Sequence, residues 1–264
     1  MVCIRKKTTR DFTLDKYREL CLTLQANGYT PLTVRDYLNS TSADSPNRET
    51  KTVIIRHDVD RKIMNALRMA KLEHEMGIHA TYYFRYPYTF KPDIIREIQE
   101  LGHEIGYHYE VLRKVRGDYQ KAIKLFESEL GEFRKISTVD TICMHGSPLS
   151  EFNNRDRWNT YNFRDYGITG EAYLSIQNVF YFTDTGRSWG SENNLRDRSD
   201  DFLYVKGLKK TDELGEFISA KFSPKIYLVT HPERWAHNTQ DQIIGAVRDY
   251  VLNWGKKLLR FQRK

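Results

Sequence analysis

The chain has 264 residues, enough for one large α/β barrel or two smaller domains. Its hydrophobic content of 39% and aromatic content of 13% indicate a folded chain and exclude a disordered one. The 42 basic residues are offset by 35 acidic ones, and the net charge of +7 is only loosely patterned, so we expect no nucleic-acid partner.

Cysteine usage gives no sign of a disulfide framework. Cys3, Cys21 and Cys143 are odd in number and lack the paired spacing of a structural zinc motif. The first ten residues contain no apolar stretch of the kind found in signal peptides, and no apolar run approaches the length of about 18 residues that crosses a membrane. We therefore expect a cytoplasmic protein without a membrane span.

The first 50 residues predict a short helical lead-in that packs on the main domain. Thr13 is a typical N-cap residue for a helix with apolar side chains at helical spacing, and Gly28 ends that helix. A second short helix is expected from Thr33, and the polar stretch 39–50 predicts a loop. We therefore divide the chain into a lead-in, residues 1–50, and a barrel domain, residues 51–264.

From residue 51 onward, strand and helix patterns alternate. Strands are expected at residues 53–58, 79–85, 104–108, 139–144, 170–176, 179–183 and 226–230. Helices are expected at residues 63–77, 92–102, 118–131, 211–221 and 239–259, whereas residues 146–165 are expected to be irregular. About seven strand–helix units predict an α/β fold with a parallel sheet curled into a barrel, whose active site lies where the strands end.

Two carboxylates end the first strong strand. Residues 53–60 read Val-Ile-Ile-Arg-His-Asp-Val-Asp, so β-branched residues lead into Asp58 and Asp60 at spacing i, i+2. In an extended chain this spacing places both carboxylates and Arg56 on one face. Two buried carboxylates are costly unless they share a cation or a proton, so a metal site or an acid–base role is the first hypothesis. The alternative is an exposed turn in which both acids are solvated.

Nearly every later strand also ends in an ionisable side chain. The strand at 104–108 brings His108 and Glu110 to one face, whereas His103 falls on the other. The remaining strands are followed by Arg85, by His145, by Asp184 with Arg187, and by His231. So many ionisable groups at one end of a barrel are difficult to explain by packing and indicate a functional site.

These residue types suit metal-assisted hydrolysis. Aspartate, histidine and a further histidine or glutamate from separate strands are ligands that Zn²⁺ or a similar divalent ion prefers, with coordination positions left open. A metal held in this way acidifies a bound water and polarises a carbonyl, while a second aspartate acts as base and another histidine as acid. The sequence thus predicts a hydrolase of amides or esters with a divalent metal ion, for which we expect Zn²⁺.

Four segments carry a resemblance to a known family. They read Arg-His-Asp-Val-Asp at 56–60, Ala-Thr-Tyr-Tyr-Phe at 80–84, Gly-His-Glu-Ile-Gly-Tyr-His at 102–108 and Leu-Val-Thr-His at 228–231. Their order resembles that of the polysaccharide deacetylase superfamily, the family 4 carbohydrate esterases with a NodB homology domain. The resemblance covers about residues 50–235. It implies a distorted (β/α)7 barrel and a metal-dependent deacetylase that acts on the N-acetyl or O-acyl group of a sugar or glycan.

The resemblance implies two of the metal ligands and leaves the third open. Asp60 matches the metal-binding aspartate of the family, and His108 matches its first metal-binding histidine. The family usually has a second histidine four residues later, where this chain has Leu112. Glu110, on the face of His108, and His145, at the end of the next strand, are the two candidates for the third ligand.

The resemblance also implies the catalytic groups. Asp58 matches the catalytic base, and His231 matches the late histidine that protonates the leaving amine. Asp184 lies where the family places a carboxylate that orients the catalytic groups. The family usually carries an arginine near the base, and Arg187 is our candidate for that role. The alternatives for this arginine are Arg56 and Arg85.

Two other functions compete with this prediction. The missing histidine at Leu112 motivates a catalytically degenerate barrel that binds glycan without hydrolysis. The adjacent His57 and Asp58 suggest an HD-type phosphohydrolase, but that class places its pair on helices, whereas here the pair ends a β-branched strand. We therefore predict a divergent deacetylase-like barrel with a sugar or glycan substrate.

Overall fold

The computed structural model describes residues 10–42, 50–146, 150–190, 198–220, 224–245, 247 and 250. The strands are β1 (Thr30–Leu32), β2 (Thr52–Val59), β3 (Thr81–Phe84), β4 (Glu104–Tyr109), β5 (Thr141–Met144), β6 (Gly170–Glu171), β7 (Val179–Thr183), β8 (Phe202–Tyr204) and β9 (Lys225–Thr230). The helices are α1 (Leu14–Ala26), α2 (Val34–Ser42), α3 (Ile63–Glu75), α4 (Pro92–Glu100), α5 (Val111–Lys114), α6 (Tyr119–Arg134) and α7 (Thr211–Ala220).

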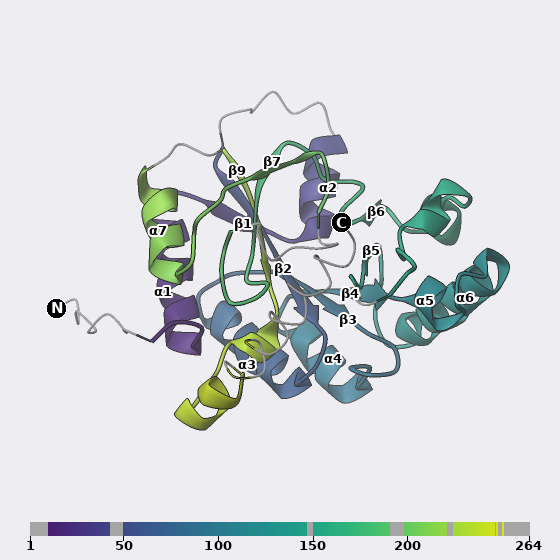
Figure 1. The fold of residues 1–264 in the computed structure, drawn as a ribbon, viewed down its shortest axis with the longest axis horizontal. Coiled ribbons are helices and arrows are strands. Elements are labelled where there is room, and N and C mark those ends of the chain that lie inside the picture. Colours follow the sequence, from purple (N-terminus) through teal and green to yellow (C-terminus); the bar gives the residue numbers. More distant parts are fainter. Residues whose placement is uncertain are drawn as a thin grey trace.

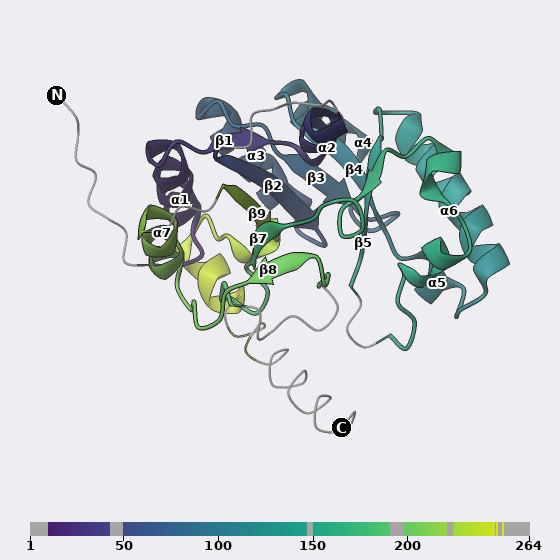
Figure 2. The same ribbon diagram turned by 90° about the horizontal axis from the view of Figure 1, so that it is seen from above.

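The strands form one parallel sheet that curls into part of a barrel. Their order is β6-β5-β4-β3-β2-β9-β7-β8, and β1 pairs with the first half of β2. Figure 1 and Figure 2 show the helices on the outside of this curled sheet, with α3 and α4 on one flank and α5 and α6 beside them. The prediction of a distorted α/β barrel with parallel strands is confirmed.

Aromatic side chains join the two end strands of the sheet path. Tyr173, just after β6, packs against Phe202 of β8 and Tyr181 of β7, with ring centroids 6.3 and 6.4 Å apart. From β9, the Tyr227 hydroxyl donates a hydrogen bond to the carbonyl oxygen of Ala172 at 3.3 Å. The side of the barrel between β6 and β8 is therefore filled by ring packing, which accounts for its distorted shape.

The predicted N-terminal helix forms as expected and packs on the barrel. The Thr13 hydroxyl caps α1 by accepting a hydrogen bond from the Lys16 backbone N–H at 3.2 Å. Tyr17, Cys21 and Leu24 form the buried face of this helix, which packs beside α7. The lead-in also contains β1, which was not predicted because three residues are too few to show a strand period. The proposed division of the chain at residue 50 stays a prediction.

Three predicted boundaries were wrong. The loop expected at 39–50 overlaps α2, which continues to Ser42. Gly131 does not end its helix, because α6 continues to Arg134 and buries Phe133. The strand expected at 170–176 stops after Glu171, whose carbonyl oxygen accepts hydrogen bonds from the backbone N–H groups of Leu174 and Ser175 in a turn. The last predicted helix begins at residue 239, as expected, and its part from residue 251 onward lies outside the described residues.

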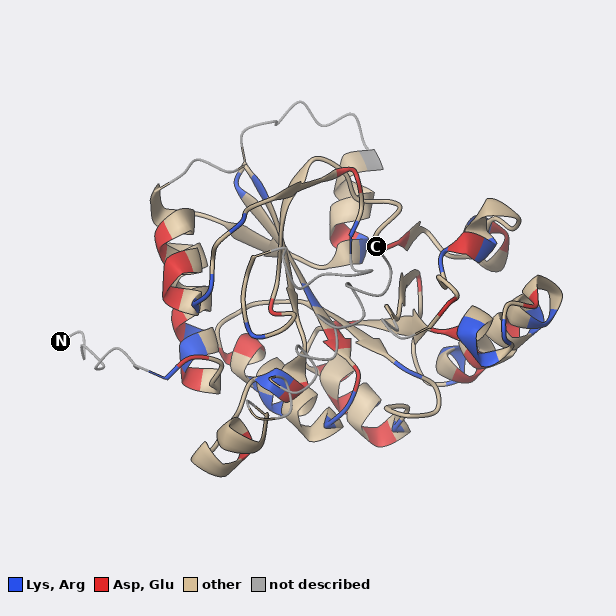
Figure 3. Ribbon diagram, viewed as in Figure 1, with Lys and Arg blue, Asp and Glu red and all other residues tan. Residues whose placement is uncertain are grey.

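Charge is distributed over the outside of the fold without one dominant sign. Figure 3 shows Lys and Arg interspersed with Asp and Glu along the outer helices, α5 and α6 among them. Among the helices that the structure describes, none combines the length and the apolar character needed to cross a bilayer.

Gly106 of β4 provides a test of the barrel interior. A Cβ atom at this position would lie 2.2 Å from Cε1 of the buried Tyr83 ring and 3.1 Å from the Thr141 carbonyl oxygen. We expect Gly106→Ala to lower the free energy of unfolding by about 2 kcal/mol, because a packed core cannot absorb the added methyl group. Urea denaturation followed by tyrosine and tryptophan fluorescence measures this change.

Gly131 is the matched control. A Cβ atom there would meet no atom within 4 Å, and the residue lies in the helical backbone of α6. Gly131→Ala should raise the free energy of unfolding by about 0.5 to 1 kcal/mol through the better helix propensity of alanine. Equal effects of the two substitutions would contradict the packing described for β4.

Candidate metal and acid–base site

The predicted site residues meet at the carboxyl end of the parallel strands. Val59 pairs with Phe84, and Phe84 pairs with Tyr107, so the next residues along β2, β3 and β4, which are Asp60, Arg85 and His108, lie at one level. The other predicted residues also end strands: Glu110 follows β4, His145 follows β5, Asp184 follows β7 and His231 follows β9. The expectation that strand ends would collect the ionisable groups is confirmed by this arrangement.

Two imidazole rings face one carboxylate oxygen of Asp60. The Asp60 Oδ1 atom lies 3.5 Å from His108 Nε2 and 3.4 Å from His145 Nε2. This oxygen is buried and has no hydrogen-bond partner within the described residues. Burial opposes ionisation of Asp60, but the nearby imidazoles of His145 and His108 hold its pKa well below the usual range. Both imidazole nitrogens therefore lie near one buried carboxylate oxygen, a place that suits a cation.

The opposite nitrogen of each ring is already engaged. His108 Nδ1 lies 3.1 Å from the Cys143 carbonyl oxygen, and His145 Nδ1 lies 3.2 Å from Glu110 Oε2. Both acceptors hold a proton on Nδ1, so Nε2 is the nitrogen of each ring that faces Asp60 and that a metal would bind in place of a proton. Glu110 thus lies behind His145 as an orienting carboxylate.

Glu110 is held in place by several cations. It accepts hydrogen bonds from Arg85 Nη2 at 2.7 Å and from Arg113 Nη1 at 3.0 Å. Burial opposes its ionisation, but the His145 hydrogen bond and the Arg85 charge lower the pKa of Glu110 to about 2. Burial likewise opposes protonation of His145, yet Asp60 and Glu110 raise its pKa to about 9. The carboxylates around His145 therefore already stabilise a positive charge at this point.

Two of the separations between these donors resemble those around a divalent metal ion. Ligand atoms at about 2.0 to 2.1 Å from a tetrahedral metal lie about 3.3 to 3.4 Å from one another. The separations of Asp60 Oδ1 from His108 Nε2 and His145 Nε2, 3.5 and 3.4 Å, are close to that spacing. One carboxylate and two imidazoles also match the ligand preference of Zn²⁺ with a coordination position left open.

A second set of donors lies beside the first. Asp58, His108 and Cys143 each offer one donor atom, and these atoms lie within 4.8 Å of one another. Both oxygens of Asp58, however, accept hydrogen bonds from Arg56, with the Arg56 Nε–Asp58 Oδ1 and Nη2–Oδ2 distances both 2.8 Å. A carboxylate bound in this bidentate way is a weaker metal ligand than the Asp60 oxygen, which accepts no hydrogen bond within the described residues, so we favour the set built on Asp60.

Arg56 is the arginine that contacts the predicted base. Its side chain is fully buried, and it also donates hydrogen bonds to the hydroxyl groups of Tyr227 at 2.8 Å and Tyr173 at 2.6 Å. Burial opposes ionisation of Asp58, but the charges of Arg56 and His108 lower its pKa below the usual value. Asp58 is therefore ionised and fixed in orientation.

A histidine–carboxylate pair lies on the other side of Asp58. Asp184 Oδ1 accepts from His231 Nδ1 at 2.6 Å and from Arg234 Nη1 at 2.7 Å, and Oδ2 accepts from the Trp235 indole N–H at 2.9 Å. Burial and the Arg234 charge oppose protonation of His231, but Asp184 and Asp58 raise its pKa. This contact orients the ring and leaves His231 Nε2 for a reacting group.

The metal-type donors and the histidine–carboxylate pair form one site. His57 pairs with Thr230 between β2 and β9, so the next residues, Asp58 and His231, lie at one level of adjacent strands. Asp58 Oδ2 also lies 3.9 Å from His108 Nε2. Asp58 is thus the link between the two groups of residues.

The structure places Arg187 differently from our candidate role. Its guanidinium lies 5.5 Å from the centre of the Phe12 ring, close to the N-terminal segment, whereas Arg56 makes the contacts to Asp58. Sequence reasoning missed Arg234 and the indole N–H of Trp235 as partners of Asp184. The available signal was their spacing of three and four residues after His231, which one helical turn brings back to the strand end.

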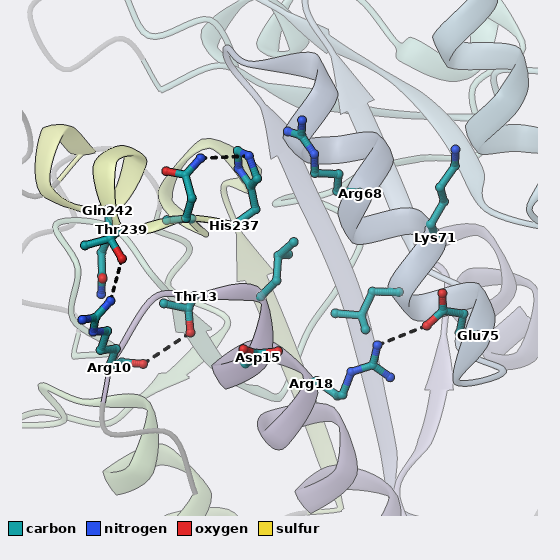
Figure 4. Close-up of a pocket in the computed structure, with 14 residues that line it drawn as sticks. Arg10, Thr13, Asp15, Arg18, Arg68, Lys71, Glu75, His237, Thr239 and Gln242 are labelled. Carbon is teal, nitrogen blue, oxygen red and sulfur yellow. Dashed lines mark hydrogen bonds and ion pairs between the residues drawn. The ribbon is translucent and has the colours of Figure 1, made fainter. Parts of the chain in front are cut away.

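Two surface pockets are candidates for the substrate-binding cleft. A cleft of about 800 Å³ is lined by Asp60 and opens beside the donor set. A pocket of about 570 Å³ lies between α1, α3 and residues 236–242, away from the strand ends (Figure 4). Charged side chains in that pocket form ion pairs with each other, as Arg18 does with Glu75 at 3.1 Å. The cleft beside Asp60 is therefore the one that adjoins the predicted site.

The donor set predicts which substitutions remove a metal. We expect the protein to bind about one zinc ion per chain, and Asp60→Asn and His145→Gln to abolish that binding, because each removes a ligand. Glu110→Gln should weaken zinc binding about 10- to 100-fold, since it orients His145 without contacting the ion. Elemental analysis and calorimetric titration with zinc measure both effects.

Cys143→Ser is the matched control for this prediction. If Asp60, His108 and His145 hold the ion, the serine variant keeps its zinc. Loss of zinc in Cys143→Ser together with retention in His145→Gln would assign the ion to Asp58, His108 and Cys143 instead.

Comparisons with known proteins point to solved structures of one kind. No family model and no curated protein sequence matches the chain. A family 4 carbohydrate esterase from Bacillus anthracis is 15% identical, covers 96% of this chain and 88% of its own, and has a TM-score of 0.44. A CE4 esterase from Streptococcus mutans is 15% identical, with 88% and 90% covered and a TM-score of 0.44. A CE4 family pseudoenzyme from Bacillus anthracis is 13% identical, with 79% and 63% covered and a TM-score of 0.41. The similar solved structures thus include members of carbohydrate esterase family 4, the family that the sequence motifs resemble.

Proposed function

We propose that this protein is a metal-dependent hydrolase that removes an N-acetyl or O-acyl group from a sugar or glycan. One observation carries the proposal: the buried Asp60 Oδ1 faces two imidazole nitrogens at 3.5 and 3.4 Å, directly beside a carboxylate that an arginine keeps ionised. The class of substrate is proposed from the resemblance of the sequence motifs to polysaccharide deacetylases.

Asp60, His108 and His145 would hold the metal, for which we propose Zn²⁺. When bound there, the ion lowers the pKa of a water molecule and polarises the acyl carbonyl group. The protein fixes these ligands before substrate arrives, since the Cys143 carbonyl orients His108 and Glu110 orients His145. His145 takes the place of the histidine that the family usually has at the position of Leu112.

Asp58 is the proposed general base. A base must be ionised and must keep its orientation while it accepts a proton from water. Arg56 provides both properties, because its two hydrogen bonds at 2.8 Å fix the carboxylate and its charge lowers the pKa of Asp58. A lowered pKa makes Asp58 a weaker base. A weak base is sufficient if the metal lowers the pKa of the water molecule.

His231 is the proposed general acid. Its Nδ1 is bound to Asp184 at 2.6 Å, and the carboxylate raises its pKa, so the ring carries a proton at Nε2 at higher pH than a free histidine would. That proton can pass to the leaving nitrogen when the carbon–nitrogen bond breaks. Asp184, anchored by Arg234 and Trp235, keeps the ring in place for this transfer.

The alternative of a glycan-binding barrel without hydrolysis has less support. It was motivated by Leu112, which is buried in α5. The described residues nevertheless contain a second imidazole, His145, at 3.4 Å from Asp60, and an ordered His231–Asp184 pair that binding alone does not require. Acetate release from N-acetylglucosamine oligosaccharides that is lost with a chelator and restored by zinc would support the enzyme.

Asp58→Asn tests the base. The amide keeps the size and one of the two hydrogen bonds from Arg56 but cannot accept the proton, so we expect turnover to fall by about 10³-fold or more, with zinc content unchanged. Acetate release and elemental analysis on the same sample measure both quantities. Loss of zinc along with activity would identify Asp58 as a metal ligand instead.

Arg56→Lys tests the partner of the base. Lysine cannot bind both oxygens of Asp58, so the pKa of Asp58 should rise toward its ordinary value. Because the ionised form is the active one, the acidic limb of the kcat/KM profile should move to higher pH. A rise of one unit lowers activity about tenfold below the limb and little above it.

Arg187→Lys is the control for this experiment, because Arg187 was the other candidate. We expect its acidic limb to coincide with that of the unaltered protein. A shift in Arg187→Lys without one in Arg56→Lys would reverse the assignment. If Arg56→Lys fails to fold, Tyr227→Phe, which removes one support of Arg56, should shift the limb in the same direction by a smaller amount.

A further inference from the structure

The cleft beside Asp60 combines an exposed aromatic ring with several cations. Its volume is about 800 Å³, and its lining includes Asp60, Arg61, Lys62, Arg85, Tyr88 and Arg113. A ligand in this cleft therefore lies next to a proposed metal ligand. The cleft is large enough for a sugar residue with a charged substituent.

Tyr88 is a rigid and accessible surface in this cleft. Its ring is 59% exposed although it is one of the larger hydrophobic side chains. The turn that carries it is tied to β2, because the Thr89 hydroxyl donates to the Val59 carbonyl oxygen at 2.9 Å and accepts from the Arg85 backbone N–H at 2.9 Å. Val59 immediately precedes Asp60, so the turn that carries the ring is fixed relative to the proposed metal site. An exposed aromatic ring held in this way suits stacking against a sugar.

The wall beside Tyr88 has an excess of positive charge. The Arg85 guanidinium lies 4.7 Å from the centre of the Tyr88 ring and binds Glu110 at 2.7 Å. Arg113 binds the same Glu110 carboxylate at 3.0 Å, so Glu110 faces two guanidinium groups, of which that of Arg85 also lies 4.0 Å from Asp60. The Arg85 side chain is 12% exposed, whereas that of Arg113 is 50% exposed. Arg113 is thus the cation that a ligand can reach.

The other two cations of the cleft, Lys62 and Arg61, are each paired with a carboxylate. Lys62 pairs with Asp241 at 3.2 Å, and Arg61 pairs with Glu233 at 3.1 Å. For Arg113, the contact with Glu110 is the one that its guanidinium makes within the described residues, and its remaining N–H groups are available to an acceptor. A carboxylate or phosphate oxygen is the acceptor that a guanidinium binds best.

We infer that the cleft binds an acylated sugar that carries an anionic group, with Tyr88 stacked on the sugar ring and Arg113 bound to a carboxylate or phosphate of the same molecule. This inference rests on the proposed function and names its substrate class. It predicts that charged N-acetyl sugars bind more tightly than neutral ones.

Binding to a protein that does not turn over its ligand tests the inference. Zinc-loaded Asp58→Asn protein is titrated by calorimetry with N-acetylglucosamine, with N-acetylglucosamine 1-phosphate and with 2-acetamido-2-deoxyglucuronic acid. We expect at least one of the two charged sugars to bind about tenfold more tightly than the neutral sugar, and the tighter one tells whether phosphate or carboxylate is preferred.

Substitutions assign this preference to residues. Arg113→Gln should remove the preference for charge, whereas Arg96→Gln, an exposed arginine of α4 outside the cleft, should keep it. Tyr88→Ala should weaken the binding of all three sugars by about the same factor. Tyr88→Phe, which keeps the ring, should leave their affinities unchanged. Equal affinity for charged and neutral sugars, or a preference that survives Arg113→Gln because the anion binds zinc directly, would overturn the inference.

The two proposals can fail separately. A protein that prefers charged sugars through Arg113 but releases no acetate from any of them keeps this inference and contradicts the proposed hydrolase. A protein that deacetylates neutral sugars and shows no preference for charge keeps the hydrolase and overturns the inference.

Discussion

The buried pair of Arg56 and Asp58 is the constraint on which the interior of the barrel depends. Both side chains are removed from solvent, and a buried ion pair is tolerated when its polar atoms are hydrogen-bonded. Two bonds join the pair, and the hydroxyl groups of Tyr173 and Tyr227 accept two more. The rings that satisfy Arg56 also fill the side of the barrel between β6 and β8, where Tyr173 meets Phe202. The same contacts therefore close the fold and fix the proposed base.

Much of this arrangement could be predicted from the sequence, because it depends on strand parity and on parallel pairing. The spacing of Arg56, Asp58 and Asp60 places them on one face in any extended conformation, and parallel strands bring His108 and His231 to the same edge. These relations are local or topological, so they hold without knowledge of side-chain packing. The expected barrel and most of its strands were correct for the same reason.

The details that were not predictable depend on side-chain direction. Glu110 and His145 follow neighbouring strands at one level. Glu110 contacts His145 Nδ1, so His145 Nε2 faces Asp60 and Glu110 lies behind the ring. Spacing alone could not separate them. The sequence also could not decide whether Arg187 or Arg56 contacts the base, because a guanidinium can reach a carboxylate from several strands. The early end of β6 depends on the turn that Glu171 stabilises, since its carboxylate accepts the backbone N–H groups of Tyr173 and Leu174.

The carboxylates at the strand ends differ in their partners, and that difference supports the assignment of a metal to Asp60. Asp58 is neutralised by Arg56, Glu110 by Arg85 with Arg113, and Asp184 by Arg234 with His231. Asp60 has two imidazoles near it, and the closest guanidinium, that of Arg85, lies 4.0 Å away and is bound to Glu110 at 2.7 Å. Asp60 and Glu110 raise the pKa of His145 to about 9, so the positive charge that faces Asp60 is that of an imidazole, and a cation that uses the same two imidazoles as ligands would replace it. The charge distribution around the strand ends thus supports the proposal of a divalent ion beside Asp60, between the proposed base and the cleft that would receive the substrate.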